Sequence, residues 1–349
     1  MVTVPRPNPS LSVRAQAPAR VPELPRDRGL TWRPLGPGDL PELTRLTSTI
    51  EQLDRTPFRT SPEEVVEWLT GSWKDLSADT VGGFEASGAL RAYALAELPP
   101  GDVSLLRSWV HGGVHPAYRG RGIGRDLVRW MDARGRQQLA AAGADAPARL
   151  VTFLEDDALD QRRLFEAAGF TPRRQYTAMR RDLRAPSPRV ELPNGLRLLP
   201  WSPGIDEQIR LAHNEAFADH WGSQPQTVEQ WSSGHAQAAT SWSFAVLDQS
   251  ATGPEPAVVG YLMSARIEQD WPVLGYTYGY VHQLGVRRAW RGRGLSVALL
   301  GAAMDAYRAD GMEYAVLDVD TENPTGAYGL YARVGFEPTH GAAMYTIEL

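Results

Sequence analysis

The chain has 349 residues, 42% hydrophobic and 22% charged, which is typical of a globular protein with room for two domains of ordinary size. It contains no Cys, which excludes disulfides, thiolate metal sites and a cysteine nucleophile. The net charge of −5 argues against a general nucleic-acid binder, and with no run of 18 apolar residues we expect no membrane partner.

The first segment, residues 1–28, combines six prolines with arginines and lacks the apolar stretch of a signal peptide. This composition predicts a disordered tail. Without a targeting signal, we expect the protein in the cytoplasm.

The remainder of the chain repeats itself, and the repeated unit is a domain rather than a short motif. Three matches recur in the same order in both halves, offset by 166 to 172 residues. They are a Gly-Leu pair leading to a Pro-Gly pair (29–38 and 195–204), an Arg-Gly-Arg-Gly motif (119–122 and 291–294), and an aromatic residue before a Gly-Phe pair (165–170 and 331–336).

These matches predict two domains, residues 29–183 and 195–349, joined by a semi-rigid linker at 184–194 that contains three prolines. Residues 195–349 hold 9 basic and 17 acidic side chains, whereas residues 1–194 hold 27 basic and 24 acidic ones. An acidic half attracts cationic ligands, so rates with such ligands should fall with salt. An unevenly solvated surface is the alternative explanation.

Each copy begins with a strand, two helical patterns and two further strands. A strand then runs into a glycine-rich turn and a long helix, followed by a strand, a short helix and a terminal strand. This order predicts an α/β or α+β sandwich. The expected strands are 30–35, 80–85, 90–98 and 149–154, then 196–201, 243–247, 258–266 and 314–319, and the early helices are 41–53, 61–69, 206–218 and 226–231.

The glycine-rich turns carry the clearest chemical signal. Each follows a strand valine, Val114 or Val286, and opens a helix. Glycines bring several N–H groups close to a ligand and the helix start adds its positive dipole end, which suits phosphate oxygens, and flanking arginines can add hydrogen bonds. A dinucleotide fingerprint fails because Arg125 and Val297 stand where its third glycine is required, and no P-loop motif occurs.

The spacing Arg-x-x-Gly-x-Gly/Ala after the valine resembles the acetyl-CoA signature of the GNAT superfamily of N-acetyltransferases. It occurs twice, each time with a Gly-Phe pair downstream, so residues 29–349 resemble a tandem GNAT protein, a layout that mycothiol synthases share. Ser296 departs from the pattern, since Gly or Ala is usual there. The resemblance implies two domains, each a mixed, mostly antiparallel sheet with a central splay, flanked by helices, and acetyl-CoA as the acyl donor.

The resemblance also implies which residues hold acetyl-CoA. The main chain before each turn binds the pantetheine arm in the splay, and the turn amides bind the pyrophosphate. In the second copy these residues are Leu284, Val286, Arg291, Gly292, Arg293, Gly294, Leu295 and Ser296, with Asn323 farther on. In the first copy they are Gly112, Val114, Arg119, Gly120, Arg121, Gly122, Ile123 and Gly124.

Moving an acetyl group from a thioester to an amine needs a base for the amine and benefits from an acid near the departing thiolate. The tyrosine four residues before the Gly-Phe pair is the usual acid in GNAT enzymes, which makes Tyr331 the candidate acid, with Tyr328 weaker. The first copy has Phe165 there, which cannot donate a proton.

For the base, strand alternation predicts that Tyr280, His282 and Leu284 share a face. His282 is the candidate, since an imidazole with a pKa near ~6.5 accepts a proton at neutral pH. A core histidine held by a hydrogen bond is the alternative reading of His282, and a water chain ending at Asp318 or Glu215 is the alternative base.

The first copy has Ser108 and Val110 at the positions that match Tyr280 and His282. With Phe165 as well, it lacks both an acid and a base. We therefore expect the second copy to catalyse and the first to be non-catalytic while still able to hold acetyl-CoA.

The acceptor pocket of GNAT folds is commonly lined by the region that matches residues 216–222. There Asp219 can bind a cationic amine and Trp221 can stack on it, with Tyr280 as a further substrate contact; a helix-end cap with a buried Trp is the alternative. His213 and His220 lie seven residues apart, but no HExxH motif or Cys supports zinc, so we expect no metal.

The preferred function is an acetyl-CoA-dependent N-acetyltransferase, active on the primary amine of a small molecule by direct attack in a ternary complex. A covalent acetyl-enzyme is not expected, because Cys is absent and no Ser/His motif is visible. A monomer is expected, since tandem domains can form an internal pseudo-dimer. A non-catalytic CoA-binding sensor or scaffold, and an enzyme acting on protein amines, remain open alternatives.

Overall fold

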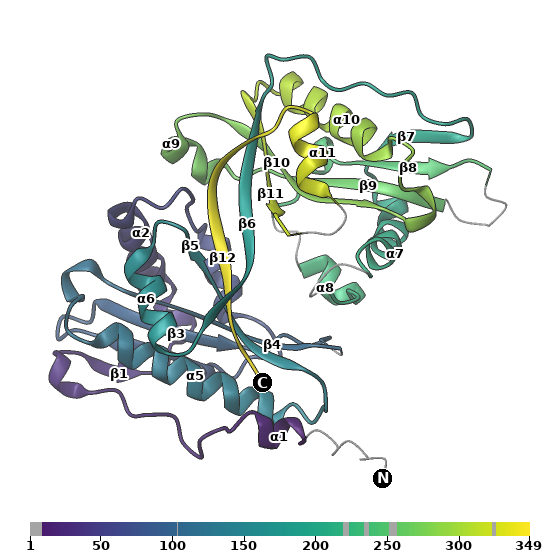
Figure 1. The fold of residues 1–349 in the computed structure, drawn as a ribbon. Helices are drawn as coiled ribbons and strands as arrows, with labels where there is room; N and C mark the ends of the chain where they lie inside the picture. The colour runs from purple at the N-terminus through teal and green to yellow at the C-terminus, as the bar shows by residue number, and fades with distance from the viewer. Residues whose placement is uncertain (1–8, 103, 219–222, 234–236, 251–256, 323–325) are drawn as a thin grey trace, which may run out of the picture. The chain divides into compact units, whose positions relative to one another are not determined.

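A computed structural model of the chain describes residues 9–102, 104–218, 223–233, 237–250, 257–322 and 326–349. They form two compact units, which are described separately here (Figure 1). Unit 1 comprises Met1–Arg173 together with Ala343–Leu349, and unit 2 comprises Arg174–Ala342. Among the described residues, no helix is both long enough and apolar enough to cross a bilayer.

Unit 1 is a mixed sheet with helices on both faces. Its strand order is β1-β2-β3-β4-β5, followed by the end of β12; β1 to β4 are antiparallel, and β5 runs parallel to β4. Helix α5 packs on one face, while α2 and α3 pack on the other. The elements are α1 (Leu11–Arg14), β1 (Thr31–Arg33), α2 (Leu40–Asp54), α3 (Pro62–Leu69), α4 (Leu76–Asp79), β2 (Thr80–Phe84), β3 (Leu90–Glu97), β4 (Leu106–Val114), α5 (Ile123–Ala141), β5 (Ala148–Glu155) and α6 (Leu159–Ala167).

Unit 2 has the same architecture, with strand order β7-β8-β9-β10-β11-β6 and then the start of β12. Helix α10 packs on one face of the sheet and α7 and α8 on the other. The elements are β6 (Thr171–Asp182), β7 (Leu196–Pro200), α7 (Asp206–Ala216), α8 (Val228–Ser233), β8 (Phe244–Asp248), β9 (Ala257–Ala265), α9 (Trp271–Leu274), β10 (Tyr278–Val286), α10 (Leu295–Ala309), β11 (Tyr314–Asp320), α11 (Ala327–Arg333) and β12 (Glu337–Glu348). The expected mixed, mostly antiparallel sheets flanked by helices are confirmed.

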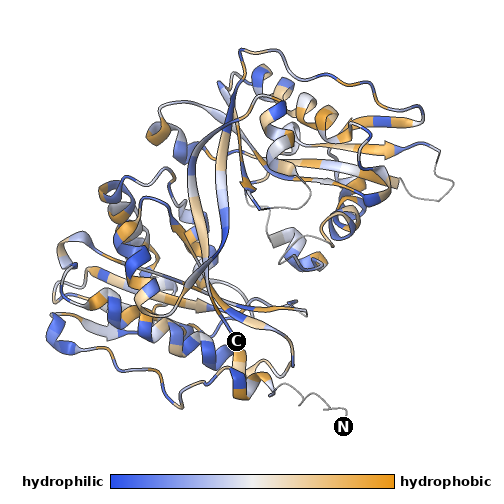
Figure 2. Cartoon of the chain, viewed as in Figure 1, coloured by the Kyte–Doolittle hydropathy of each residue, from blue (hydrophilic) through white to orange (hydrophobic). Residues whose placement is uncertain are grey.

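Local sequence signals explain several of these elements. Ser61 begins α3 as predicted, because its side chain accepts from the Glu64 amide while the Glu64 carboxylate accepts from the Ser61 amide. Helix α5 is amphipathic: Leu127 and Met131 are buried, whereas Arg125 is exposed, and Figure 2 shows the resulting alternation of hydrophobic and hydrophilic colours.

The last strand of each sequence copy extends into the unit formed by the other copy. β6 is the last strand of the first copy, yet it pairs antiparallel with β11, from Tyr176 opposite Asp320 to Asp182 opposite Tyr314. Conversely, residues 343–349 belong to unit 1, where Tyr345 is fully buried. The expected limits at 183 and 349 therefore differ from the compact units, because a sequence repeat does not reveal which sheet an edge strand joins.

Residues 9–28 differ from the expected disordered tail, and residues 1–8 lie outside the described part of the chain. Leu11 and Ala15 are buried in the core beneath α5. Arg14 donates to the carbonyl of Leu349 at 2.6 Å and to that of Ala146 at 2.8 Å. The prolines thus form an extended strap, because apolar and arginine side chains between them supply specific contacts.

The linker is ordered in the same way along α10. A Cβ at Gly301 of α10 would lie 2.3 Å from the Pro188 carbonyl oxygen, so glycine permits the close approach. Arg308 donates to the carbonyls of Leu183 and Ala185. Each repeat therefore includes a strap over its long helix, upstream of the first matching motif.

Candidate active site

Each unit has a splay between its two parallel central strands. β10 and β11 pair only from Tyr278–Tyr314 to Tyr280–Val316, and β10 then continues to Val286 against β9. In unit 1 the parallel pairing of β4 with β5 likewise ends at Trp109. The resemblance found in the sequence implies that the acyl donor enters the opening beyond these pairs.

A β-bulge interrupts β10 at His282. In the pairing with β9, Val281 is opposite Ser264 and Gln283 is opposite Met263, so His282 is the extra residue. An extra residue reverses the alternation of side chains along the rest of the strand. The pairing of β4 with β3 shows no such shift.

Because of the bulge, the expectation that Tyr280, His282 and Leu284 share one face is wrong. Leu284 packs with Val281 in the core beneath α10, whereas Tyr280 and Gln283 lie on the opposite face of the sheet. His282 is exposed, and its ring centre is 6.3 Å from that of Tyr280.

On the face opposite α10, Tyr280 and Asp318 connect the two splayed strands. The Tyr280 hydroxyl donates to Oδ2 of Asp318 at 2.7 Å. Burial, followed by the Asp318 charge and this hydrogen bond, raises the pKa of Tyr280 well above its usual value. Tyr331 on α11 is close enough to contribute to the same upward shift. The structure thus joins Tyr280 and Asp318 at the opening.

Strand pairing identifies Trp109 and Phe153 as the unit 1 counterparts of Tyr280 and Asp318. Trp109 and Tyr280 are each the last residue that pairs with the parallel neighbour, and Phe153 and Asp318 each lie two residues beyond that point on the neighbour. The Trp109 and Phe153 rings stack with centres 5.7 Å apart. Unit 1 therefore has an apolar stack where unit 2 has a hydroxyl–carboxylate hydrogen bond.

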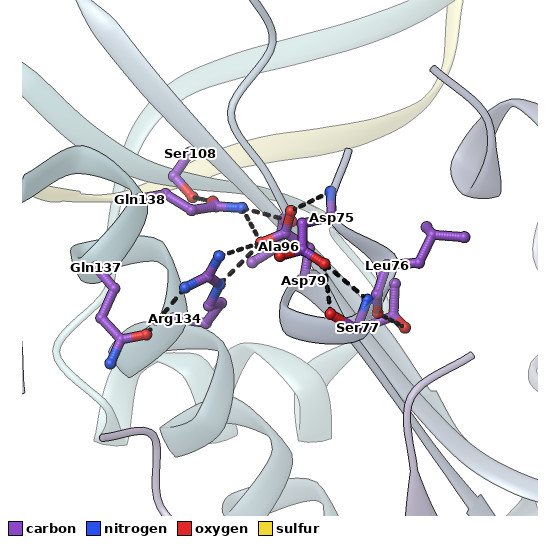
Figure 3. Close-up of polar contacts among 10 residues, drawn as sticks. Asp75, Leu76, Ser77, Asp79, Ala96, Ser108, Arg134, Gln137 and Gln138 are labelled. Carbon is purple, nitrogen blue, oxygen red and sulfur yellow. Dashed lines mark hydrogen bonds and ion pairs between the residues drawn. The ribbon is translucent and has the colours of Figure 1, made fainter. Parts of the chain in front are cut away.

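Ser108, which the sequence offset matches to Tyr280, faces α5 because β4 has no bulge. It is fully buried, and its hydroxyl donates to Gln138 at 2.8 Å (Figure 3). Gln138 and Arg134 each donate to Oδ1 of Asp79 at 2.8 Å. These contacts give Ser108 a packing role that joins β4, α5 and α4.

Tyr331 and Phe165 occupy the same place on α11 and α6. The Tyr331 ring packs against Phe336 at 5.8 Å, and Phe165 packs against Phe170 at 5.1 Å. Burial raises the pKa of Tyr331 to about 12. Among the described residues, no hydrogen-bond partner of the Tyr331 hydroxyl is present.

The two glycine turns have the same backbone conformation. φ is +75° at Gly120 and +84° at Gly122, against +74° at Gly292 and +82° at Gly294, a region that L side chains rarely adopt. Gly122 and Gly294 are the N-caps of α5 and α10, with no side-chain cap. The first amides of both helices thus suit an anion, which fits the diphosphate of acetyl-CoA. The other expected turn residues follow the same path: Arg121, Ile123 and Gly124 in unit 1, and Arg293, Leu295 and Ser296 in unit 2.

The side chains of Arg119 and Arg291 form hydrogen bonds within the protein, next to their turns, and do not extend freely toward a phosphate. Each Nε donates at 3.2 Å to the carbonyl of the strand valine that precedes the turn, Val114 or Val286. Arg119 also makes two hydrogen bonds to the Asp54 carboxylate, and Arg291 donates to a carbonyl at the end of α7. Their side chains hold the turn in place for the backbone amides.

The remaining candidates have different outcomes. The Glu215 carboxylate is paired with Arg287 at 2.5 Å. Asp219, Trp221 and Asn323 lie outside the described residues, as does His220. In the described part of the chain, no group of three or more His, Asp or Glu side chains is arranged to hold a metal ion.

The sequence analysis missed two polar residues on the face opposite α10, Tyr261 and Gln283. The Tyr261 hydroxyl is 2.6 Å from Nδ1 of His213 and 3.4 Å from Oε1 of Gln283. The available signal was that Tyr261 has a counterpart, Tyr93, in the matching strand of the first copy.

Comparisons with known protein families and relatives identify the kind of domain that both units contain. The model of the acetyltransferase (GNAT) family matches residues 207–336, and that of the acetyltransferase (GNAT) domain matches residues 88–172. A mycothiol acetyltransferase from Salinispora tropica is 34% identical over 257 residues, which span 72% of this chain and 76% of the relative. The chain belongs to the GNAT family of N-acetyltransferases.

Further similar proteins match most of the chain. A mycothiol acetyltransferase from Thermobispora bispora is 34% identical over 233 residues, 64% of this chain and 70% of the relative. The crystal structure of a GCN5-related N-acetyltransferase from Sphaerobacter thermophilus has a TM-score of 0.68 at 28% identity, covering 93% of this chain and 97% of that one. A tandem GNAT protein from the clavulanic acid biosynthesis pathway shares the fold, with a TM-score of 0.63 at 19% identity over 91% and 98% of the two chains. The chain is thus a tandem GNAT enzyme, and its similarity to these proteins extends over almost its whole length.

Proposed function

We propose that unit 2 transfers the acetyl group of acetyl-CoA to the primary amine of a small molecule, by direct attack in a ternary complex. The contrast between the two splays supports this assignment to unit 2. Polar groups that bind or move protons occur at three matching positions in unit 2 and are replaced by apolar rings in unit 1. The pairs are Tyr280 and Trp109, Asp318 and Phe153, and Tyr331 and Phe165.

In this proposal acetyl-CoA supplies the activated acyl group, and side chains of unit 2 manage the protons. His282, exposed at the bulge, accepts the proton that an ammonium group must lose before its nitrogen can attack. As the new C–N bond forms and the C–S bond breaks, Tyr331 donates its phenolic proton to the departing sulfur. The nitrogen of the new amide then gives up its remaining extra proton, which restores the Tyr331 phenol. A pKa of about 12 keeps Tyr331 protonated until that moment.

The acceptor binds on the face that carries Tyr280 and Asp318. The Asp318 carboxylate is exposed and negatively charged, which favours a cationic amine. The relatives named mycothiol acetyltransferase support a small-molecule acceptor, and we put a mycothiol-related amine first among the candidates. Unit 1 keeps the glycine turn and, in this proposal, holds acetyl-CoA without turnover.

The test incubates the full chain with acetyl-CoA and a panel of amines that includes mycothiol-related ones, with the acetylated product identified by mass spectrometry. Because the chain has no Cys, a thiol reagent reports only CoA and any acceptor thiol. We expect product from the wild type, a loss of roughly 100-fold or more in Tyr331→Phe, and full activity in Phe165→Tyr. Acetyl-CoA binding without product from any amine would refute the proposal in favour of a sensor.

A further inference from the structure

A buried histidine–tyrosine pair lies behind the acceptor face of unit 2. His213 on α7 is 5% exposed, Tyr261 on β9 is fully buried, and Nδ1 of His213 is 2.6 Å from the Tyr261 hydroxyl. Aromatic rings surround the imidazole, with Phe217 at 4.6 Å and Trp231 at 5.3 Å between ring centres. Buried polar atoms lower stability unless they are hydrogen-bonded, and this bond pairs Nδ1 of His213 with the Tyr261 hydroxyl.

The pair connects to the splay through Gln283. The Tyr261 hydroxyl is 3.4 Å from Oε1 of Gln283, the first residue after the bulge, on the part of β10 beyond its pairing with β11. Gly285 makes this possible, because a Cβ there would lie 2.5 Å from the Tyr261 ring. Two successive contacts, from His213 to Tyr261 and from Tyr261 to Gln283, therefore link the buried histidine to a side-chain amide. This amide lies on the same face of the sheet as Tyr280.

Unit 1 contains the same tyrosine with different partners. Tyr93 holds the strand position that corresponds to Tyr261, and its hydroxyl is 3.1 Å from Nε2 of His111, which corresponds to Gln283. The tyrosine thus belongs to the scaffold of both units. The group that it fixes on the splayed strand differs, an imidazole in unit 1 and a carboxamide in unit 2.

We propose that His213 and Tyr261 are positioning residues that fix the Gln283 carboxamide, and that this amide selects acceptors with an oxygen atom next to the reacting amine. The inference rests on the proposed function of unit 2. A tyrosine hydroxyl has a single proton. When Tyr261 donates it to Oε1 of Gln283, His213 donates from Nδ1 to Tyr261, and Nε2 of Gln283 is turned away from Tyr261 toward the acceptor face.

The chemistry of Nε2 sets the kind of acceptor. An amide NH₂ group donates hydrogen bonds, so its partner is a hydroxyl or carbonyl oxygen. An acceptor that lacks this oxygen leaves the amide unpaired in the closed complex, which costs binding free energy. The site therefore discriminates an amino alcohol or an amino acid derivative from a plain alkylamine.

The experiment compares an amine that the wild type acetylates with an analogue in which a methylene or methyl group replaces the neighbouring oxygen. We expect the wild type to prefer the oxygen-bearing amine by roughly tenfold or more in kcat/KM, mainly through KM. Gln283→Leu and Tyr261→Phe should remove most of this preference. His213→Gln, which keeps an N–H donor, should retain more of it than His213→Leu.

Tyr93→Phe is the matched control in unit 1 and should change neither the rates nor the preference. Thermal unfolding and acetyl-CoA binding by each variant show whether its fold and donor site are intact. Turnover confined to amines without such an oxygen, or an unchanged preference in folded Gln283→Leu and Tyr261→Phe, would overturn the inference while leaving the proposed function standing. Absence of turnover with every amine would instead overturn the proposed function.

Discussion

Tyr280 donates a hydrogen bond to Asp318 at 2.7 Å across the opening between β10 and β11. The positions that correspond to them in unit 1 hold Trp109 and Phe153, whose rings stack. The two units thus share a backbone and differ in the polarity of the splay. Asp318 is exposed, so its side chain contributes little to the packing of the fold.

Asp318→Asn should therefore lower activity with little effect on stability. The variant keeps a hydrogen-bond acceptor for Tyr280 but removes the negative charge that favours a cationic amine. We expect kcat/KM to fall about tenfold, with the free energy of unfolding changed by less than ~0.5 kcal/mol, as for most exposed sites. Steady-state kinetics and urea unfolding measure both quantities. Phe153→Leu is the control, and an equal loss of activity there would contradict the division of labour between the units.

The pH dependence of Tyr331 follows from its surroundings. Burial raises its pKa to about 12 in the folded state, against ~10 in an unfolded chain. A raised pKa favours the protonated phenol, so its contribution to stability is fully present below pH ~10 and is lost as the pH rises through about 12. We expect no alkaline decline of kcat from this group between pH 7 and 9, measured as a pH–rate profile. A decline in that range that disappears in Tyr331→Phe would argue against the assignment.

Features that depend on local backbone rules could be predicted from the sequence. The N-cap positions of Gly122 and Gly294 could be identified in the sequence, because a positive φ at a helix N-cap nearly requires glycine. The aromatic position of Tyr331 and Phe165 could be identified because it keeps a fixed sequence distance to the Gly-Phe pair that follows each short helix.

Features set by strand pairing could not be predicted. β4 and β10 are both nine residues long, so nothing in their spacing reveals the extra residue at His282. Because of that one residue, Tyr280 lies on the face opposite α10, while Ser108, at the matching sequence position, points into the core. The pairing of β10 with β9 decides this register, and alternation within one strand carries no record of it.

The exchanged end of β12 gives a stability prediction for unit 1. Tyr345 is fully buried there, accepts a hydrogen bond from Nε of Arg162 at 2.8 Å and donates one to Glu166 at 3.1 Å. Tyr345→Ala should lower the free energy of unfolding of unit 1 by about 3–5 kcal/mol, as for other large aromatic truncations in cores. Hydrogen exchange should speed up in β5 and α6 peptides. Thr339→Ala, earlier on the same strand and in unit 2, should leave those peptides unchanged.

The glycine N-caps offer a matched comparison between the units. An alanine at either position meets a positive φ, +84° at Gly122 and +82° at Gly294, which costs about 1–2 kcal/mol. The new Cβ at Gly294 would also lie 2.9 Å from Cγ2 of Val190, whereas at Gly122 the nearest atom is the flexible end of Arg28 at 3.4 Å. Gly294→Ala should therefore cost about 1 kcal/mol more than Gly122→Ala, as overpacking does.

Urea unfolding of the two variants measures the difference, and Val190→Ala reveals its cause. Val190 is 41% exposed, so its truncation alone should cost little. Combined with Gly294→Ala, it removes the methyl group that the new Cβ would meet, and the double variant should recover to about the level of Gly122→Ala. The double variant could instead lose as much unfolding free energy as the two single variants together. In that case Val190 of the linker does not clash with the new Cβ, and the extra cost of Gly294→Ala arises from the backbone alone.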